Sequence, residues 1–228
     1  MFRLVEAIEC AGYRGRVISD TQLARIVGGD PARRYGLVNR ALKSGALVRI
    51  KRGLYTLGGP RQPALHPFIV AQSLQTGSYV SLETALSYHG WIPEGVFTTA
   101  SITPERKSFE RITDQFGHFS FHTIAIERFG FYAAVDRIQF GPSVAFIAQP
   151  LRALMDLVAL RKAPWQGLGW LVDGLRIDED RLKSLRKRDF AAMSDVYKHF
   201  AARSFLTRLE SELLASKNLQ PHSGEAET

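Results

Sequence analysis

The segment Gly28-Gly29-Asp30-Pro31 predicts a tight turn between two helices near the start of the chain. Paired glycines favour a turn, and Asp30 is a good N-cap. Pro31 suits the first helical position, because the N–H that proline lacks would have no partner there. Upstream, Ser19 and Gln22 have the spacing of a capping box. We therefore expect one helix from about 20 to 27 and a second from 31 to Gly45.

Two further patterns complete an N-terminal unit. Apolar residues at helical spacing predict a helix over 3–11 that stops at Gly12. Two β-prone runs, 47–50 and 54–57, flank Lys51-Arg52-Gly53 and predict a hairpin with a basic tip. A helix, a helix-turn-helix and a basic hairpin within 57 residues follow the order of a winged helix-turn-helix.

The excess of positive charge lies entirely in this unit. Residues 1–62 contain twelve Lys or Arg against four Asp or Glu, whereas the remaining 166 residues contain 18 of each. A basic module followed by a neutral one is typical of a polyanion-binding domain joined to a domain with another partner.

The rest of the chain predicts a second, mixed domain. Glycine and proline over 59–64 indicate a linker between a domain at 1–58 and an α+β domain at 65–217, with a disordered tail at 218–228. Helices are expected over 68–74, over 81–89 and from Pro150 to Lys217, and strands over 78–80, 97–103, 119–126, 137–140 and 144–148. The predicted class is α+β, with an N-terminal winged helix-turn-helix, an antiparallel sheet and a helical C-terminal part.

The basic unit suggests specific contacts to double-stranded DNA. Recognition helices usually present their N-terminal residues to base edges, which here are Arg33, Arg34 and Tyr35. Arginine can bind guanine O6 and N7 with two hydrogen bonds. The residues expected to contact phosphates or to project from the recognition helix are Arg40, Lys43, Arg49, Lys51 and Arg52.

Signatures of catalysis, cofactors and metals are weak. The chain has no Walker loop, no GxGxxG after a strand, no HExxH and no GxSxG. His118 and His122 flank a strand-like segment, which is a poor start for one metal site. Ser81, Glu83 and His89 contain the ingredients of acid–base chemistry, but we expect Ser81 to cap a helix and a partly positive His89 to lie near its end. We predict no enzyme activity, no catalytic residue, no cofactor and no metal.

Cellular location follows from composition. The single cysteine, Cys10, excludes an internal disulfide framework and fits a reducing compartment. No apolar run approaches the roughly 20 residues of a membrane span, and Glu6 and Glu9 interrupt the apolar N-terminus. We expect a soluble cytoplasmic protein without a membrane partner.

Four segments carry a resemblance to a known family. They are Arg52-Gly53-Leu54-Tyr55, the stretch 78–86 (SYVSLETAL), the stretch 89–94 (HGWIPE) and the stretch 148–157 (AQPLRALMDL). In this order and spacing they resemble the AbiEi-type antitoxins of type IV toxin–antitoxin systems, over roughly residues 5–215.

The resemblance implies a transcription regulator of an abortive-infection, phage-defence system. Its winged helix-turn-helix would repress its own promoter through inverted repeats. Its C-terminal domain would counter a nucleotidyltransferase-like toxin, encoded beside it, without a stable complex. The DNA-binding positions would be the basic residues of the third helix and the wing. The C-terminal domain offers one basic cluster, either a solvated helix end or a partner contact: Lys183, Arg186, Lys187 and Arg188.

Two alternatives stay open at this point. The chain could be a stand-alone regulator whose mixed domain binds a ligand or oligomerises, or a nuclease that the basic module delivers to DNA. The leading hypothesis has two molecules on inverted half-sites, and it leaves open whether the protein is a monomer in solution or a dimer on DNA.

Overall fold

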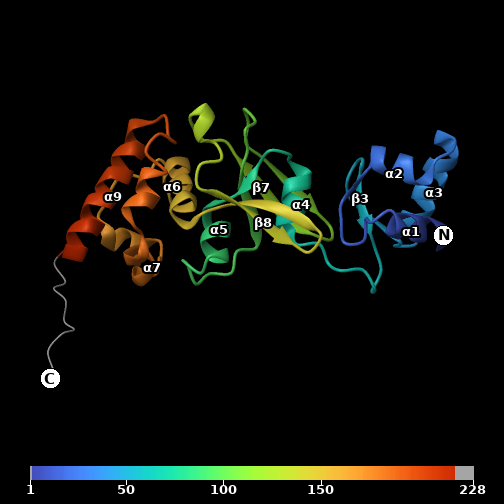
Figure 1. Ribbon diagram of the computed structural model, residues 1–228, viewed down its shortest axis with the longest axis horizontal. Coiled ribbons are helices and arrows are strands. Elements are labelled where there is room, and N and C mark those ends of the chain that lie inside the picture. Colours follow the sequence, from blue (N-terminus) through green and yellow to red (C-terminus); the bar gives the residue numbers. More distant parts are fainter. Residues whose placement is uncertain (1, 219–228) are drawn as a thin grey trace, which may run out of the picture.

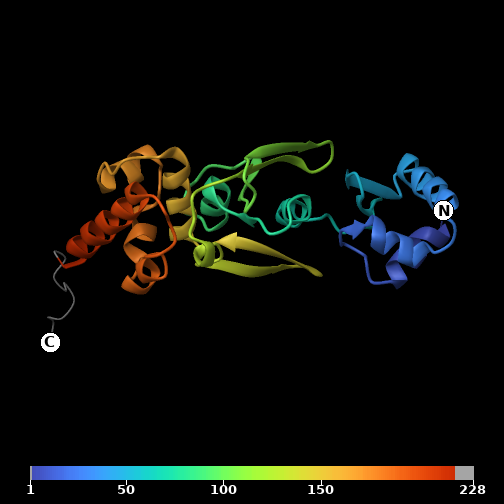
Figure 2. The same ribbon diagram turned by 90° about the horizontal axis from the view of Figure 1, so that it is seen from above.

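The computed structural model describes residues 2–218 and has an elongated shape (Figure 1). The N-terminal elements lie at one end, a sheet lies in the middle and the C-terminal helices lie at the other end (Figures 1 and 2). Asn218 ends the last helix, and the other residues of the predicted tail lie outside the described residues.

Helices α1 (Phe2–Cys10), α2 (Asp20–Val27) and α3 (Pro31–Lys43) form the N-terminal unit with three short strands. The predicted capping box is confirmed. The Ser19 hydroxyl accepts from the Gln22 backbone N–H at 3.2 Å, and the Gln22 side chain accepts from the Ser19 N–H at 2.8 Å. The Asp30 carboxylate accepts from the Arg33 N–H at 3.1 Å, so α3 begins where the sequence predicted.

The predicted hairpin is present as β2 (Leu47–Lys51) and β3 (Leu54–Leu57). Gly53 lies at its turn with φ of +80°, a conformation that favours glycine. A two-residue strand, β1 (Ile18–Ser19), pairs with β3 and gives the sheet order β1-β3-β2. Sequence analysis missed β1 because two residues carry no periodic pattern.

The second sheet has six strands in the order β6-β7-β5-β4-β9-β8. The strands are β4 (Tyr79–Val80), β5 (Thr98–Ile102), β6 (Phe109–Thr113), β7 (Gly117–His122), β8 (Val135–Phe140) and β9 (Ser143–Ala148). The prediction of an antiparallel sheet is correct only in part: β4–β5, β6–β7 and β8–β9 are antiparallel, whereas β5 pairs with β7 and β4 pairs with β9 in parallel, so the sheet is mixed. The parallel β5–β7 pair follows from β6, a strand that was not predicted. It turns back outside β7, so that β7 runs beside β5 in the same direction.

Helices cover both faces of this sheet. Helix α4 (Pro67–Leu74) packs its Val70 and Leu74 against Phe119 and Phe121 of β7. The intervening β7 residues, Ser120 and His122, border a hollow near α5 (Leu82–Tyr88) and the end of α6 (Pro150–Arg161). Strand alternation thus makes β7 apolar toward α4 and polar toward the hollow.

The C-terminal part is helical with interruptions. After α6 come a five-residue π-helix, η2 (Trp170–Gly174), and the helices α7 (Glu179–Ser184), α8 (Lys187–Ala191) and α9 (Phe200–Asn218). A short 3-10 helix, η1 (Arg128–Gly130), lies earlier, between β7 and β8. The prediction of helix throughout 150–217 is therefore correct only in part. Within residues 2–218, no helix is both long and apolar enough to cross a bilayer.

A buried ion pair joins the sheet to the C-terminal helices. Arg152 and Asp156 on α6 are fully buried, with Nε and Oδ1 2.9 Å apart. The hydroxyls of Tyr79, Ser81 and Tyr197 donate to the Asp156 carboxylate at 2.7–2.9 Å. The Arg152 guanidinium also donates to three backbone carbonyls, those of Gly130, Phe131 and Ala133. Burial disfavours the charge of Arg152, but Asp156 and the two tyrosines more than offset it and raise its pKa.

Candidate nucleic-acid interface

Helix α3 and the β2–β3 hairpin frame a polar hollow of about 610 Å³ in the N-terminal unit. Arg34 and Tyr35 reach it from the first turns of α3, and Arg49 and Arg52 reach it from the hairpin. Tyr35 exposes 72% of its surface, although it is a large aromatic residue. An exposed aromatic ring among three arginines is a surface suited to a nucleic acid.

The exposed face of α3 is shaped for close approach. At about 100° per residue, Val38 and Ala41 point into the core, and the opposite face has Gly36 near its centre. A Cβ on Gly36 would lie 3.5 Å from Arg40 Nη1, so the Arg40 guanidinium lies beside this glycine. A small central residue lets the helix backbone approach a groove, while longer side chains flank it.

Asn39 belongs to this surface and was missed by sequence analysis. It is half-buried on α3 and lines a second hollow together with Lys43. Asparagine can make two hydrogen bonds with adenine, which makes it a candidate for base recognition. The helical position relative to Val38 and Ala41 could have identified it, but a search for charged residues could not.

The structure places the predicted DNA-binding residues on connected elements. The set comprises Arg33, Arg34, Tyr35, Arg40 and Lys43 on α3, Arg49 and Lys51 on β2, and Arg52 at the hairpin turn. All are exposed except Arg34, which is half-buried.

Lys51 has a structural contact as well. Its Nζ donates to the Leu74 carbonyl at the end of α4, at 2.7 Å. Burial is the main cause that lowers the pKa of Lys51, and the positive charge of Arg111 on β6 is the second. Its neighbour Ile50 is buried in a cluster with Val70 and Leu74. Strand β2 is therefore fixed against the second domain.

The hairpin is also fixed against α2. The Asp20 backbone N–H donates to the Gly53 carbonyl at 2.9 Å. Burial, together with the negative charge of Asp20, raises the pKa of Tyr55 on β3. These contacts place the basic residues of the hairpin before any ligand arrives.

The predicted partner cluster is partly engaged within the chain. Lys183 Nζ lies 2.8 Å from Glu179 Oε1, and this contact raises the Lys183 pKa. The Arg188 guanidinium lies 3.7 Å from Asp189. Arg186 and Lys187 are exposed at the start of α8. The structure thus brings three of the four residues together at one helix start.

The three residues considered for acid–base chemistry are held apart. Ser81 precedes α5 but does not cap it through its side chain, because its hydroxyl donates to buried Asp156. Glu83 pairs with Arg161, and His89 Nε2 contacts the Ala148 carbonyl at 2.9 Å. The expected Ser81 cap is wrong. His89 does end α5, as expected, but burial lowers its pKa and so disfavours the positive charge that was expected there.

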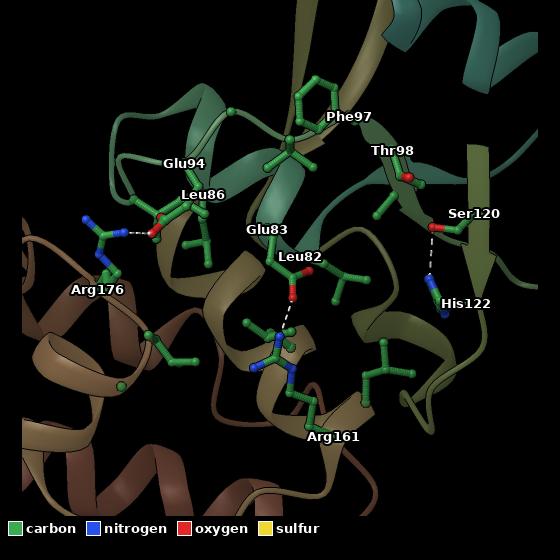
Figure 3. A pocket seen from close by; sticks show the side chains of 18 residues that line it. Leu82, Glu83, Leu86, Glu94, Phe97, Thr98, Ser120, His122, Arg161 and Arg176 are labelled. Atoms are coloured by element: carbon green, nitrogen blue, oxygen red, sulfur yellow. Dashed lines mark hydrogen bonds and ion pairs between the residues drawn. The ribbon is translucent and has the colours of Figure 1, made fainter. Parts of the chain in front are cut away.

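A separate hollow of about 660 Å³ lies in the second domain, bordered by α5, β5, β7 and the end of α6 (Figure 3). Two ion pairs lie on its rim: Glu83 with Arg161 at 2.5 Å, and Glu94 with Arg176 at 2.6 Å (Figure 3). His122 contacts the Ser120 hydroxyl at 3.0 Å, and burial lowers its pKa. Its apolar lining and rim of paired charges are typical of a binding surface.

Neither the models of known protein families nor the curated protein sequences match this chain. Within residues 2–218, no group of three or more His, Cys, Asp or Glu is arranged to hold a metal ion. The basic surface of α3 and the hairpin is a feature from which a function can be argued.

Proposed function

We propose that this protein is a DNA-binding transcriptional autorepressor and the antitoxin of a type IV toxin–antitoxin system, acting in the cytoplasm. The observation that carries the DNA-binding half is the single surface formed by α3 and the β2–β3 hairpin, on which basic side chains surround the exposed Tyr35. Duplex DNA is the polyanion that fits a helix flanked by a basic hairpin.

The order of elements supports a winged helix-turn-helix. Helices α2 and α3 are joined by the Gly28-Gly29 turn, and the β2–β3 hairpin follows α3 directly. In this arrangement α3 enters the major groove, and the hairpin is the wing that contacts the backbone. Two molecules on inverted half-sites would then block transcription of the operon.

The antitoxin half of the proposal rests on the sequence resemblance. The segment 148–157 that carries part of it contributes Arg152 and Asp156, whose contacts are internal. These residues therefore support the domain rather than bind a toxin. Co-expression with a neighbouring nucleotidyltransferase-like gene tests this half: rescue of growth supports it, and unchanged toxicity contradicts it.

The DNA-binding half is tested by fluorescence anisotropy with a duplex from the gene's own upstream region. We expect preference over a scrambled duplex and a logarithmic salt slope of several units. The double variant Arg33→Ala/Arg34→Ala should reduce both affinity and sequence preference, whereas Arg208→Ala on exposed α9 should not. Unchanged affinity and preference in the double variant would show that α3 does not read the bases.

A second candidate function is favoured by the hollow in Figure 3. A volume of about 660 Å³ is of the size that binds a small molecule, and exposed Phe97 and Val96 at its edge suit an oligomer contact. A regulator that binds a ligand or oligomerises through this domain would bind operator DNA without any toxin neighbour. Operator binding combined with failure of toxin rescue would favour it.

A further inference from the structure

Another hollow lies on the far side of the wing, between the N-terminal unit and the second domain. Its volume is about 630 Å³. One wall carries Lys43, Arg49 and Lys51, and the other is the tip of the β6–β7 hairpin, residues 112–115. This hairpin extends from the sheet toward the N-terminal unit (Figure 2). Arg49 lines both this hollow and the one beside Tyr35, so β2 separates the two.

The residues that line the hollow carry a net positive charge. Among residues 2–218, none of the ion pairs involves Lys43, Arg49 or Lys51. Burial lowers the Lys51 pKa most, and the nearby positive charge of Arg111 lowers it further. Asp114 is the one carboxylate in the lining. Cations gathered in this way repel each other until an anion lies between them.

We propose that this hollow receives a phosphodiester strand of the duplex that α3 binds, so that the β6–β7 hairpin of the second domain is a second DNA contact. The inference rests on the proposed function. A DNA strand fits better than a free anion because exposed Lys43 and half-buried Asn39 of α3, the helix proposed to bind DNA, also line the wall of the hollow. The DNA backbone that borders the groove bound by α3 would then pass along the wall that Asn39 and Lys43 form.

The walls are held in place before DNA binds. The Lys51 bond to the Leu74 carbonyl and the burial of Ile50 attach the wing to the second domain. On the other wall, the Thr113 hydroxyl donates to the Gly117 carbonyl at 3.1 Å and accepts from the Phe116 N–H at 3.1 Å. A preformed hollow positions a phosphate at little cost in conformational entropy.

The test measures salt dependence of operator binding by the full chain. Asp114 is exposed at the hairpin tip, so Asp114→Lys places a cation in the hollow without disturbing the core. We expect tighter binding and a logarithmic salt slope steeper by about 0.9, the value for one added phosphate contact. Asp195→Lys makes the same change in net charge on an exposed residue between α8 and α9, and should leave the slope unchanged.

A second pair of variants removes charge instead. Arg111→Ala should make the slope shallower, and its matched control, Arg208→Ala on α9, should not. The wild type could bind its operator while Asp114→Lys and Arg111→Ala have the same salt slopes as their controls. That result would show that the β6–β7 hairpin does not contact DNA, and it would leave the proposed function intact. If the wild type binds no duplex, the proposed function fails and this inference fails with it.

Discussion

Arg152 and Asp156 show how a charge is tolerated in the core of the second domain. Both are fully buried, and the Asp156 carboxylate accepts from three hydroxyls as well as from Arg152. Burial, then the nearby carboxylate, raises the pKa of Tyr79 and of Tyr197, which keeps both hydroxyls protonated as donors. Every charge in the cluster has a partner, which is the condition under which a buried pair is stable.

Removing one partner should therefore destabilise the protein strongly. We expect Asp156→Asn to lower the free energy of unfolding by about 3–5 kcal/mol, because Arg152 would be left as an uncompensated buried charge. Urea unfolding followed by circular dichroism measures this change. The double variant Arg152→Leu/Asp156→Leu should be more stable than the single variant, because it buries no charge. Equal losses in the single and the double variant would show that the charges themselves do not matter.

His89 makes stability depend on pH. Burial lowers its pKa below the ordinary histidine value of 6.5, so the unfolded chain binds a proton more readily than the folded one. The stabilising contribution is full above about pH 6.5 and is lost as the pH falls through the lower folded pKa. We expect the free energy of unfolding to fall between pH 7.5 and pH 5, and to fall less in His89→Gln. The exposed His118→Gln variant is the control, and a pH dependence unchanged in His89→Gln would contradict the assignment.

Single residues were predictable from sequence where their partner is nearby in the chain. Ser19 and Asp30 bond to a backbone three residues away, and their spacing alone identified them. Ser81 stands at an equivalent position before a helix, but its partner is Asp156, 75 residues further along. Local spacing has no means of indicating such a partner, and the Asp156 carboxylate competes successfully for the hydroxyl.

The stability of helix α3 depends on the cap of its first turn. This helix carries both core residues and proposed DNA contacts. Asp30→Ala removes the acceptor of the Arg33 N–H and should cost about 1 kcal/mol of stability. Because the first turn carries Arg33 and Arg34, fraying there should also weaken operator binding. Asp30→Ser retains a capping acceptor and is the control for both measurements. Thermal unfolding and anisotropy check the result, and equal behaviour of the two variants would exclude a role for the cap.

Elements with a strong pattern were predicted, but the pairing of strands that are distant in the chain was not. The β2–β3 hairpin and the starts of α3 and α6 follow apolar periodicity and turn residues, and they are confirmed. The parallel pairing of β5 with β7 was missed, because the direction of a pair depends on where β6 returns. The pattern of β6 is also weak, since three of its five residues are exposed.

At the scale of the molecule, the β2–β3 hairpin is shared by two parts of the chain. Its β3 strand belongs to the N-terminal sheet, while Ile50 and Lys51 of β2 contact the second domain. The charge split along the sequence indicated two modules but contained no information about this contact. The sequence pattern predicts Ile50 only as a strand residue. Its packing against Val70 and Leu74 shows that it also attaches the hairpin to the second domain.

This shared strand should couple DNA binding to the second domain. If the β2–β3 hairpin binds DNA as proposed, DNA should restrain Ile50 and Lys51, and these contacts should in turn restrain α4 and β7. We expect operator DNA to slow amide hydrogen exchange in α4 and β7 as well as in α3. Ile50→Ala removes most of the apolar contact and should confine the protection to the N-terminal unit. The control is Val48→Ala, a half-buried neighbour on β2 outside the Ile50 cluster. Protection limited to the N-terminal unit in the wild type would show that the wing moves independently of the second domain.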